Sequence, residues 1–130
     1  YEVGVLGRCN DAMARMYGFE RAAELVGTRL VHMLPAADPR NVEVLRGMIR
    51  REYRVEGQET WEPDRDGNVR CYSNNVVGIV QHGVLLRAWG TQRDITAMKR
   101  VQLELEQALV TAEAERLLAR RAQGEAEDAN

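Results

Sequence analysis

Two histidines, two cysteines and one serine are the residues best suited to chemistry, and their spacing matches no familiar site. His32 and His82 lack the short ligand spacing that structural zinc sites use. Cys9 and Cys71 are also far apart, so we expect reduced thiols rather than a disulfide framework. Ser73 lacks the flanking glycines of a nucleophile elbow, and no G-x-x-x-x-G-K phosphate loop occurs. We therefore expect no metal site and no enzyme activity in these 130 residues.

The composition is typical of a soluble globular chain, with 45% hydrophobic and 29% charged residues and a net charge of -2. No run approaches the ~20 apolar residues of a membrane-spanning helix. The small net charge does not favour nucleic acid or an anionic membrane as a partner. The chain begins at Tyr1 without an initiator Met or a signal-peptide pattern. We expect a piece of a longer, cytoplasmic protein.

The first part of the sequence predicts one strand and two short helices. Residues 3–9 are rich in Val and Leu and alternate weakly, which favours a strand. Asn10 is a good N-cap for a short helix, and Gly18 ends it. A second short helix is predicted at residues 21–25, and an apolar cluster follows at residues 30–34.

A longer helix is predicted at about residues 40–52. Asp38 supplies the N-cap, and Pro39 suits the first turn because its missing N–H has no helical partner there. Four residues at helical spacing give this helix one apolar face: Val42, Leu45, Met48 and Ile49.

The middle of the chain predicts a three-stranded meander. Residues 53–61, 69–80 and 84–95 are rich in strand-forming side chains. The D-R-D-G run at 64–67 and the Q-H-G run at 81–83 predict the two connecting turns. Because strands and helices are segregated along the chain, we expect an α+β fold with an antiparallel sheet.

A long helix follows the strands, because residues 97–122 contain no Pro or Gly and are rich in Glu, Leu, Ala and Arg. Residues 124–130 are expected to fray. The predicted organisation is a core domain at 1–96 and a helical extension at 97–130.

Several short motifs resemble those of the PAS domain, or sensory box, and they occur in the family's order. They are N-D-A at 10–12, Y-G-F at 17–19, E-L-V-G at 24–27, D-R-D-G at 64–67 with Arg70, and W-G-T-Q-R-D-I-T at 89–96. The resemblance covers about residues 3–96 and implies an antiparallel sheet with short helices on one face. The family's first strand, which lies at the sheet centre, has no counterpart here. Its absence would leave an exposed sheet edge.

The resemblance also raises the question of a cofactor, which the sequence leaves unknown. Haem-binding relatives take an axial His from the longer helix or nearby, and residues 42–52 contain none. Light-sensing flavin relatives carry a reactive Cys in an N-C-R-F-L run, which is absent, and Cys9 lies in a different element. Haem and covalently bound flavin are therefore disfavoured.

By resemblance, a ligand pocket would lie between the inner sheet face and the longer helix. Strand alternation puts Ala88, Gly90 and Gln92 on one face, and placing Gln92 inward matches the family. Polar groups converging on an apolar space suit a small molecule, although they could also satisfy one another or bind water. The candidate pocket residues are Leu45, Met48, Ile49, Tyr72, Asn74, Val76, Ala88, Gly90 and Gln92.

The D-I-T run, Asp94, Ile95 and Thr96, resembles the junction at which the family's core meets its signalling helix. Asp94 or Thr96 can cap the helix that follows, which would tie the last strand to it. An ordinary helix cap without a signalling role is the alternative.

The terminal helix carries a heptad pattern typical of a coiled coil. A second stripe, at Leu103, Val110 and Leu117, competes with it, and Glu115 interrupts the first. We expect a parallel homodimer in which the first stripe lies at the interface. Its leading residues are Met98, Val101, Leu105, Ala108 and Ala112.

Together these observations favour the sensory and dimerisation input module of a bacterial signalling protein. It would couple a small ligand, or a partner's state, through the terminal helix to an effector such as a histidine kinase. A ligand-free pairing module is one alternative. The sensory domain of a transcriptional regulator, with its DNA-binding effector outside this chain, is the other.

Overall fold

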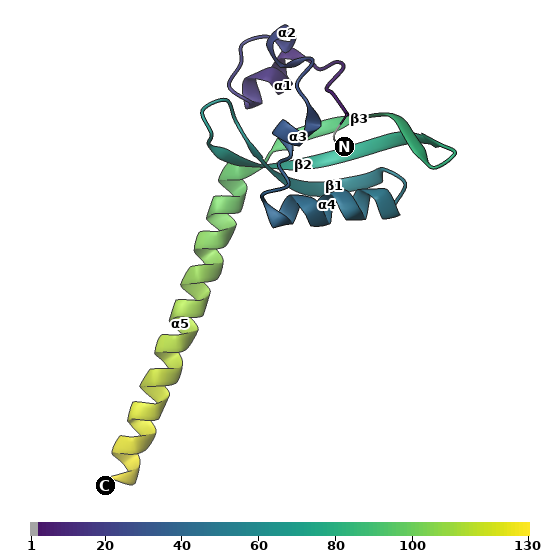
Figure 1. The fold of residues 1–130 in the computed structure, drawn as a ribbon. Helices are drawn as coiled ribbons and strands as arrows, with labels where there is room; N and C mark the ends of the chain where they lie inside the picture. The colour runs from purple at the N-terminus through teal and green to yellow at the C-terminus, as the bar shows by residue number, and fades with distance from the viewer. Residues whose placement is uncertain (1–2) are drawn as a thin grey trace. The chain divides into compact units, whose positions relative to one another are not determined.

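The computed structural model describes residues 3–130, and the chain divides into two compact units, Tyr1–Thr96 and Ala97–Asn130. Tyr1 and Glu2, which open the domain predicted at 1–96, lie outside the described residues. The elements in chain order are α1 (Asp11–Met16), α2 (Ala22–Leu25), α3 (Leu30–Met33), α4 (Pro39–Arg50), β1 (Arg54–Pro63), β2 (Val69–Gln81), β3 (Val84–Asp94) and α5 (Thr96–Asp128) (Figure 1). The predicted α+β class is confirmed, with its antiparallel sheet and long terminal helix.

The sheet is a meander in the order β1-β2-β3, and both strand pairs are antiparallel. The β2–β3 turn is short because Gln81 pairs directly with Val84. His82 (φ 50°) and Gly83 (φ 76°) between them both adopt the left-handed backbone that a two-residue hairpin requires. In the β1–β2 turn, Asp64 accepts hydrogen bonds from the backbone N–H groups of residues 66 and 68.

The strand predicted at residues 3–9 does not form, and this prediction is wrong. Val5 makes only an isolated bridge with Arg29. The Leu6 N–H donates to the Thr28 carbonyl (2.9 Å), and the Leu6 carbonyl accepts from Gly27 N–H (2.7 Å). The backbone groups of this segment therefore hydrogen-bond to the loop after α2 rather than to the sheet. As a result, β3 is an edge strand of the described sheet.

The helix caps follow the sequence closely. The Asn10 side chain accepts a hydrogen bond from Met13 N–H (2.9 Å), which confirms it as the N-cap of α1. Asp38 caps α4 by accepting from Arg40 N–H (3.0 Å), with Pro39 in the first turn. These caps satisfy N–H groups that have no partner within the helix.

Asn41 anchors α4 beside the outer edge of β1, where Figure 1 shows the helix running along the strand. This side chain is fully buried. Its amide donates to the carbonyl oxygens of Trp61 (3.0 Å) and Pro35 (3.1 Å), and its oxygen accepts from Trp61 N–H (3.4 Å). The carboxamide thus takes the place of a neighbouring strand at that point and protects an otherwise open sheet edge.

The hydrophobic core lies between the short helices and the beginning of β2. Its buried members are Ala14, Tyr17, Leu25, Met33 and Tyr72. The rings of Tyr17 and Tyr72 lie 5.3 Å apart, a spacing that suits tilted aromatic contact. This packing fixes the end of α1 on the inner face of the sheet.

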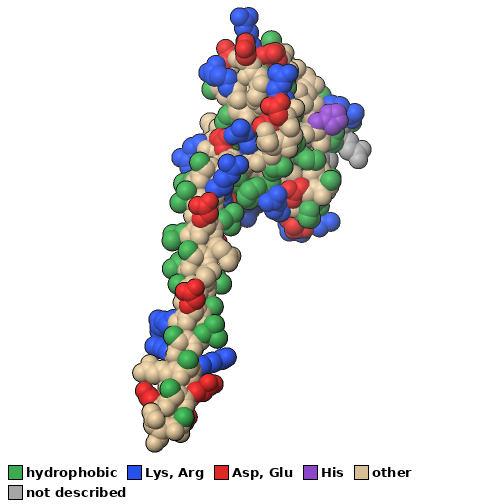
Figure 2. Space-filling model, turned by 90° about the vertical axis from the view of Figure 1, so that its left-hand side faces the viewer, with side chains coloured by type: hydrophobic (Ala, Val, Ile, Leu, Met, Phe, Trp, Pro, Cys, Tyr) green, Lys and Arg blue, Asp and Glu red, His purple; other side chains and the backbone are tan. Residues whose placement is uncertain are grey.

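The terminal helix is longer than predicted, because α5 continues through Gly124 to Asp128. A single helical Gly costs only about 1 kcal/mol relative to Ala, and strong helix formers surround this one. The prediction that residues 124–130 fray is therefore wrong for all but the last two. Figure 2 shows hydrophobic side chains spaced along α5, with charged ones between them. Across residues 3–130, each helix is too short or too polar to cross a membrane.

Candidate functional site

The strand register brings the predicted inward-facing residues onto one face of the sheet. Asn74 lies opposite Gln92, and Val76 lies opposite Gly90. Thr60 of β1 lies opposite Tyr72. Since cross-strand neighbours share a face, this face runs across all three strands.

A buried carboxylate lies at the centre of this face. Glu62 is 6% exposed. Its carboxylate accepts a hydrogen bond from the Tyr17 hydroxyl and another from the Thr60 hydroxyl (3.1 Å). The Gln92 amide donates to the same carboxylate (3.2 Å) and to the Tyr17 oxygen (3.1 Å). The cluster joins α1, β1 and β3.

Asn74 and Tyr72 extend the polar cluster along β2. The Asn74 amide donates to the Thr60 hydroxyl (2.9 Å) and to the Gln58 carbonyl (2.9 Å). The Tyr72 hydroxyl donates to the Met16 carbonyl at the end of α1 (3.0 Å). Among residues 3–130, every buried side-chain polar atom has a hydrogen-bond partner. The inner face is therefore polar but internally satisfied.

The surroundings of Glu62 change its acidity. Burial raises the pKa of the Glu62 carboxyl, and hydrogen bonds from Tyr17, Thr60 and Gln92 offset part of that rise. Burial and the neighbouring Glu62 charge raise the pKa of the Tyr17 hydroxyl. Both shifts favour the protonated, neutral form of each group.

The remainder of the candidate pocket is open. Val76, Leu45 and Met48 are half-buried. Ala88 and Gly90 are exposed. The α4 helix lies against β1, and Ile49 on it is 60% exposed, so Ile49 does not cover the cluster.

Gly90 has a structural role beyond leaving space. A Cβ atom at this position would lie 1.8 Å from the Asn75 carbonyl oxygen and 3.1 Å from the Val76 Cα. Both atoms belong to the backbone of β2, and displacing that backbone costs free energy. Close approach of β2 and β3 therefore requires glycine here.

The junction between β3 and α5 is tightly hydrogen-bonded. The sequence left open whether Asp94 or Thr96 caps α5, and the capping side chain is that of Asp94. Its carboxylate accepts from the Thr96 N–H (2.9 Å) and from the Thr96 hydroxyl (2.5 Å). The Thr96 hydroxyl oxygen accepts from Cys71 N–H (3.0 Å), and Ile95 N–H donates to the Cys71 carbonyl (2.9 Å). Both Ile95 and Thr96 are buried. The first residue of α5 is thus bonded to β2.

Arg70 adds an ionic link to this junction. Its guanidinium lies 3.3 Å from the Asp64 carboxylate in the β1–β2 turn and 3.4 Å from the Asp94 carboxylate. Since Arg70 is partly exposed, each pair contributes modestly on its own. Together they place the turn, the end of β3 and the start of α5 around one side chain.

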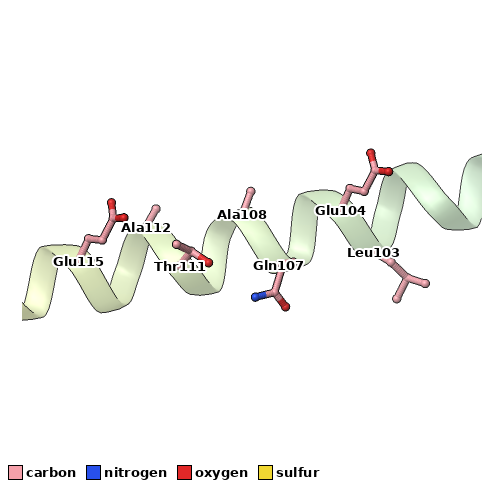
Figure 3. A pocket seen from close by; sticks show the side chains of 7 residues that line it. All are labelled: Leu103, Glu104, Gln107, Ala108, Thr111, Ala112 and Glu115. Atoms are coloured by element: carbon pink, nitrogen blue, oxygen red, sulfur yellow. The ribbon is translucent and has the colours of Figure 1, made fainter.

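The predicted dimer residues are exposed along α5, including Met98 (57%), Val101 (65%) and Leu105 (59%). A hollow on this helix is lined by residues of α5 alone, Ala108 and Ala112 among them. Figure 3 shows Glu104, Ala108, Ala112 and Glu115 on one side of the helix. Side chains of a single helix cannot enclose a ligand, so this hollow is an open surface.

Sequence analysis missed Tyr17, Thr60 and Glu62 as members of the polar cluster. A usable signal existed, because alternation along β1 puts Thr60 and Glu62 on the face that carries Tyr72. Among residues 3–130, no three His, Cys, Asp or Glu side chains gather as metal ligands.

Comparison with known proteins agrees with this geometry. The family model of the PAS fold matches residues 4–95. A solved structure from work on a flavin analogue and the mechanism of a light-oxygen-voltage domain is similar, with a TM-score of 0.51 at 16% identity. It covers 75% of this chain and 73% of that chain, and at this identity the likeness shows the fold alone. No curated protein matches significantly in sequence. The chain belongs to the PAS family of signal-sensing domains.

Proposed function

We propose that the chain is the sensory and dimerisation input module of a signal-transduction protein, in which α5 carries the output. The observation that carries this proposal is the bonded junction, where Thr96 joins the cap of α5 to Cys71 of β2. A change in the twist of the sheet would alter these bonds. The first turn of α5 would then change with the sheet.

The input would be a small ligand, or a partner, that acts on the inner face of the sheet. Gln92 supports this proposal because it bonds to the buried cluster and lies two residues before Asp94 in β3. The candidate ligand site comprises eight of the nine residues named from the sequence, without the exposed Ile49, together with Tyr17, Thr60 and Glu62. The proposal assigns no reaction to this chain.

The output would be the pairing of α5 with α5 of a second copy, in parallel. Three large apolar side chains at heptad spacing, Met98, Val101 and Leu105, support this, since an exposed apolar stripe gains from burial against a partner. The effector would be a histidine kinase in the parent chain, in the cytoplasm. Neither nucleic acid nor a membrane is a partner of this module in the proposal.

A ligand-free pairing module is the second candidate, and one observation favours it. The buried polar groups of the inner face already bond to one another. A ligand would have to replace some of these hydrogen bonds.

Native and denaturing mass spectrometry of the purified chain at several concentrations tests the proposal. A dimer with an additional small mass that is lost on denaturation supports the ligand-sensing module. A dimer without added mass supports the pairing module. A monomer at every concentration contradicts both.

A pair of variants then tests the helix interface. Leu105→Glu puts a charge in the predicted seam and should shift the chain to monomer in sedimentation experiments. Gln107→Glu is the matched control, because it adds the same charge outside that seam. If only Gln107→Glu dissociates the dimer, the interface is the competing stripe through Leu103 and Val110.

A further inference from the structure

Glu62 is a buried carboxyl group, and within the described residues 3–130 it forms no salt bridge with a cation. It is 6% exposed and lies on the inner face of β1. Among residues 3–130, the salt bridges join other acids, and none reaches Glu62. A buried carboxylate without a cation is costly, so such a group tends to bind a proton instead.

The groups that face Glu62 are neutral hydrogen-bonding side chains. Tyr17 comes from the end of α1, Thr60 from β1 itself and Gln92 from β3, and the phenol of Tyr72 lies nearby on β2. The nearest strand position that carries a cation is Arg70, directly opposite in the register. Its guanidinium bonds to the two acids of the junction, Asp64 and Asp94, instead of Glu62.

We propose that Glu62 is a buried proton-binding site whose neutral form holds the end of α1 on the sheet and whose ionised form loosens it. The hydrogen bonds of the cluster accommodate both states. When ionised, Glu62 accepts from the Tyr17 hydroxyl and the Gln92 amide. When neutral, it donates its proton to the Tyr17 oxygen, and the Tyr17 hydroxyl donates onward to the side-chain amide oxygen of Gln92 (3.2 Å).

The residues that would respond are those at the end of α1. Tyr17 is the C-cap of α1, and its carbonyl accepts from Arg65 N–H in the β1–β2 turn (2.9 Å). The Met16 carbonyl accepts from the Tyr72 hydroxyl (3.0 Å). Water drawn toward an ionised Glu62 would first compete for the hydrogen bond between the Tyr17 hydroxyl and the Glu62 carboxylate. This end of α1 would then open while its other contacts to the sheet remain.

The direction of the pH effect follows from the burial of Glu62. Because burial raises its pKa in the folded chain, the neutral form is the one that folding favours. The stabilisation is therefore complete at acidic pH, below the ordinary value of about 4.3 for an unfolded Glu. It is lost as the pH rises through the raised folded-state pKa.

Carboxyl carbon NMR across a pH titration of the 130-residue chain tests the site directly. The signal absent from Glu62→Gln identifies Glu62. A midpoint clearly above that of the exposed Glu56 on the same strand is the expected result. A midpoint equal to that of Glu56 overturns the proposal.

Thermal unfolding of variants across the same pH range tests the consequence. The melting temperature of the natural chain should fall as the pH rises, and Glu62→Gln should reduce that slope, because the amide cannot ionise. Glu56→Gln is the matched control and should keep the natural slope. An unchanged slope in Glu62→Gln contradicts the proposal.

Hydrogen exchange locates the motion without relying on global stability. The amides of residues 17–19 should lose protection at high pH, after correction for intrinsic exchange, more than the amides of α4. Tyr17→Phe should remove this difference because it lacks the hydroxyl that bonds Glu62. Equal changes in both regions of the natural chain would overturn the assigned motion.

Discussion

The two ends of the sheet differ sharply in how deeply their side chains are buried. At the junction end, where β2 begins and β3 finishes, Tyr72 is fully buried and Thr96 is 8% exposed. At the hairpin end, toward the β2–β3 turn, Val84, Leu86 and Trp89 are each more than half exposed. The same two strands thus have a packed end and an uncovered end.

This difference indicates where the sheet can move. The junction end is bonded to α1 through Tyr17 and Tyr72, and it carries the cap of α5 through Asp94. The hairpin end depends mostly on the strand ladder itself. Few tertiary contacts mean that local opening costs little, so exchange and fluctuation should concentrate there.

The largest effect should come from Gly90→Ala, at the boundary between the two ends. Its Cβ would approach the Asn75 carbonyl oxygen to 1.8 Å, which forces β2 and β3 apart. We expect a loss of about 1–3 kcal/mol or more in the free energy of unfolding, measured with urea.

Gly47→Ala in α4 is the control for this substitution. A Cβ there meets nothing within 4 Å, so the change should stabilise the helix by about 0.5–1 kcal/mol. Equal effects of the two substitutions would contradict the account of the strand contact.

Thr96→Val tests the packed end and should have the next largest effect. It removes the hydroxyl that accepts from the buried Cys71 N–H, so this hydrogen bond is lost. A cost of about 1–3 kcal/mol in unfolding free energy is expected. Thr91→Val, at an exposed position of β3, should stay within about 0.5 kcal/mol. A similar cost for both would remove the distinction between the two ends.

Gln92→Leu should keep the fold but shift its pH dependence. The Gln92 amide donates to Glu62, and this bond lowers the pKa of that carboxyl. Without the donor, the pKa of Glu62 rises further. The loss of stability with increasing pH should then continue to a higher pH, as thermal melts would record. A shift to lower pH would be the wrong sign for this account.

Trp89→Ser should have the smallest effect on the isolated chain. Trp89 is 56% exposed at the hairpin end, so its removal should change the unfolding free energy by about 0.5 kcal/mol or less. Chemical unfolding at low protein concentration measures this. A loss several times larger would show that a partner covers the hairpin end in solution.

The sequence predicted well the features that depend on local chemistry. The caps at Asn10 and Asp38 and the turn around His82 follow from side chains next to the backbone groups they satisfy. The shared face of Asn74 and Gln92 follows from strand alternation.

Features that depend on a distant partner were predicted poorly. The strand expected at residues 3–9 failed because its backbone bonds to the loop near Thr28. Glu62 was overlooked because a carboxylate beside a turn is typical of the surface. Glu62 becomes an interior residue only because Tyr17, at the end of α1, packs against it.

The central claim, that the sheet controls the pairing of α5, is tested most directly by sedimentation equilibrium of the two threonine variants. In Thr96→Val, each α5 loses a hydroxyl bond at its first residue, worth about 1 kcal/mol per chain. The account predicts a homodimer that Thr96→Val weakens by roughly thirtyfold, since two chains lose about 2 kcal/mol together, while Thr91→Val leaves its affinity unchanged. Equal dimer affinities for the natural chain and Thr96→Val, or no dimer of the natural chain, would contradict it.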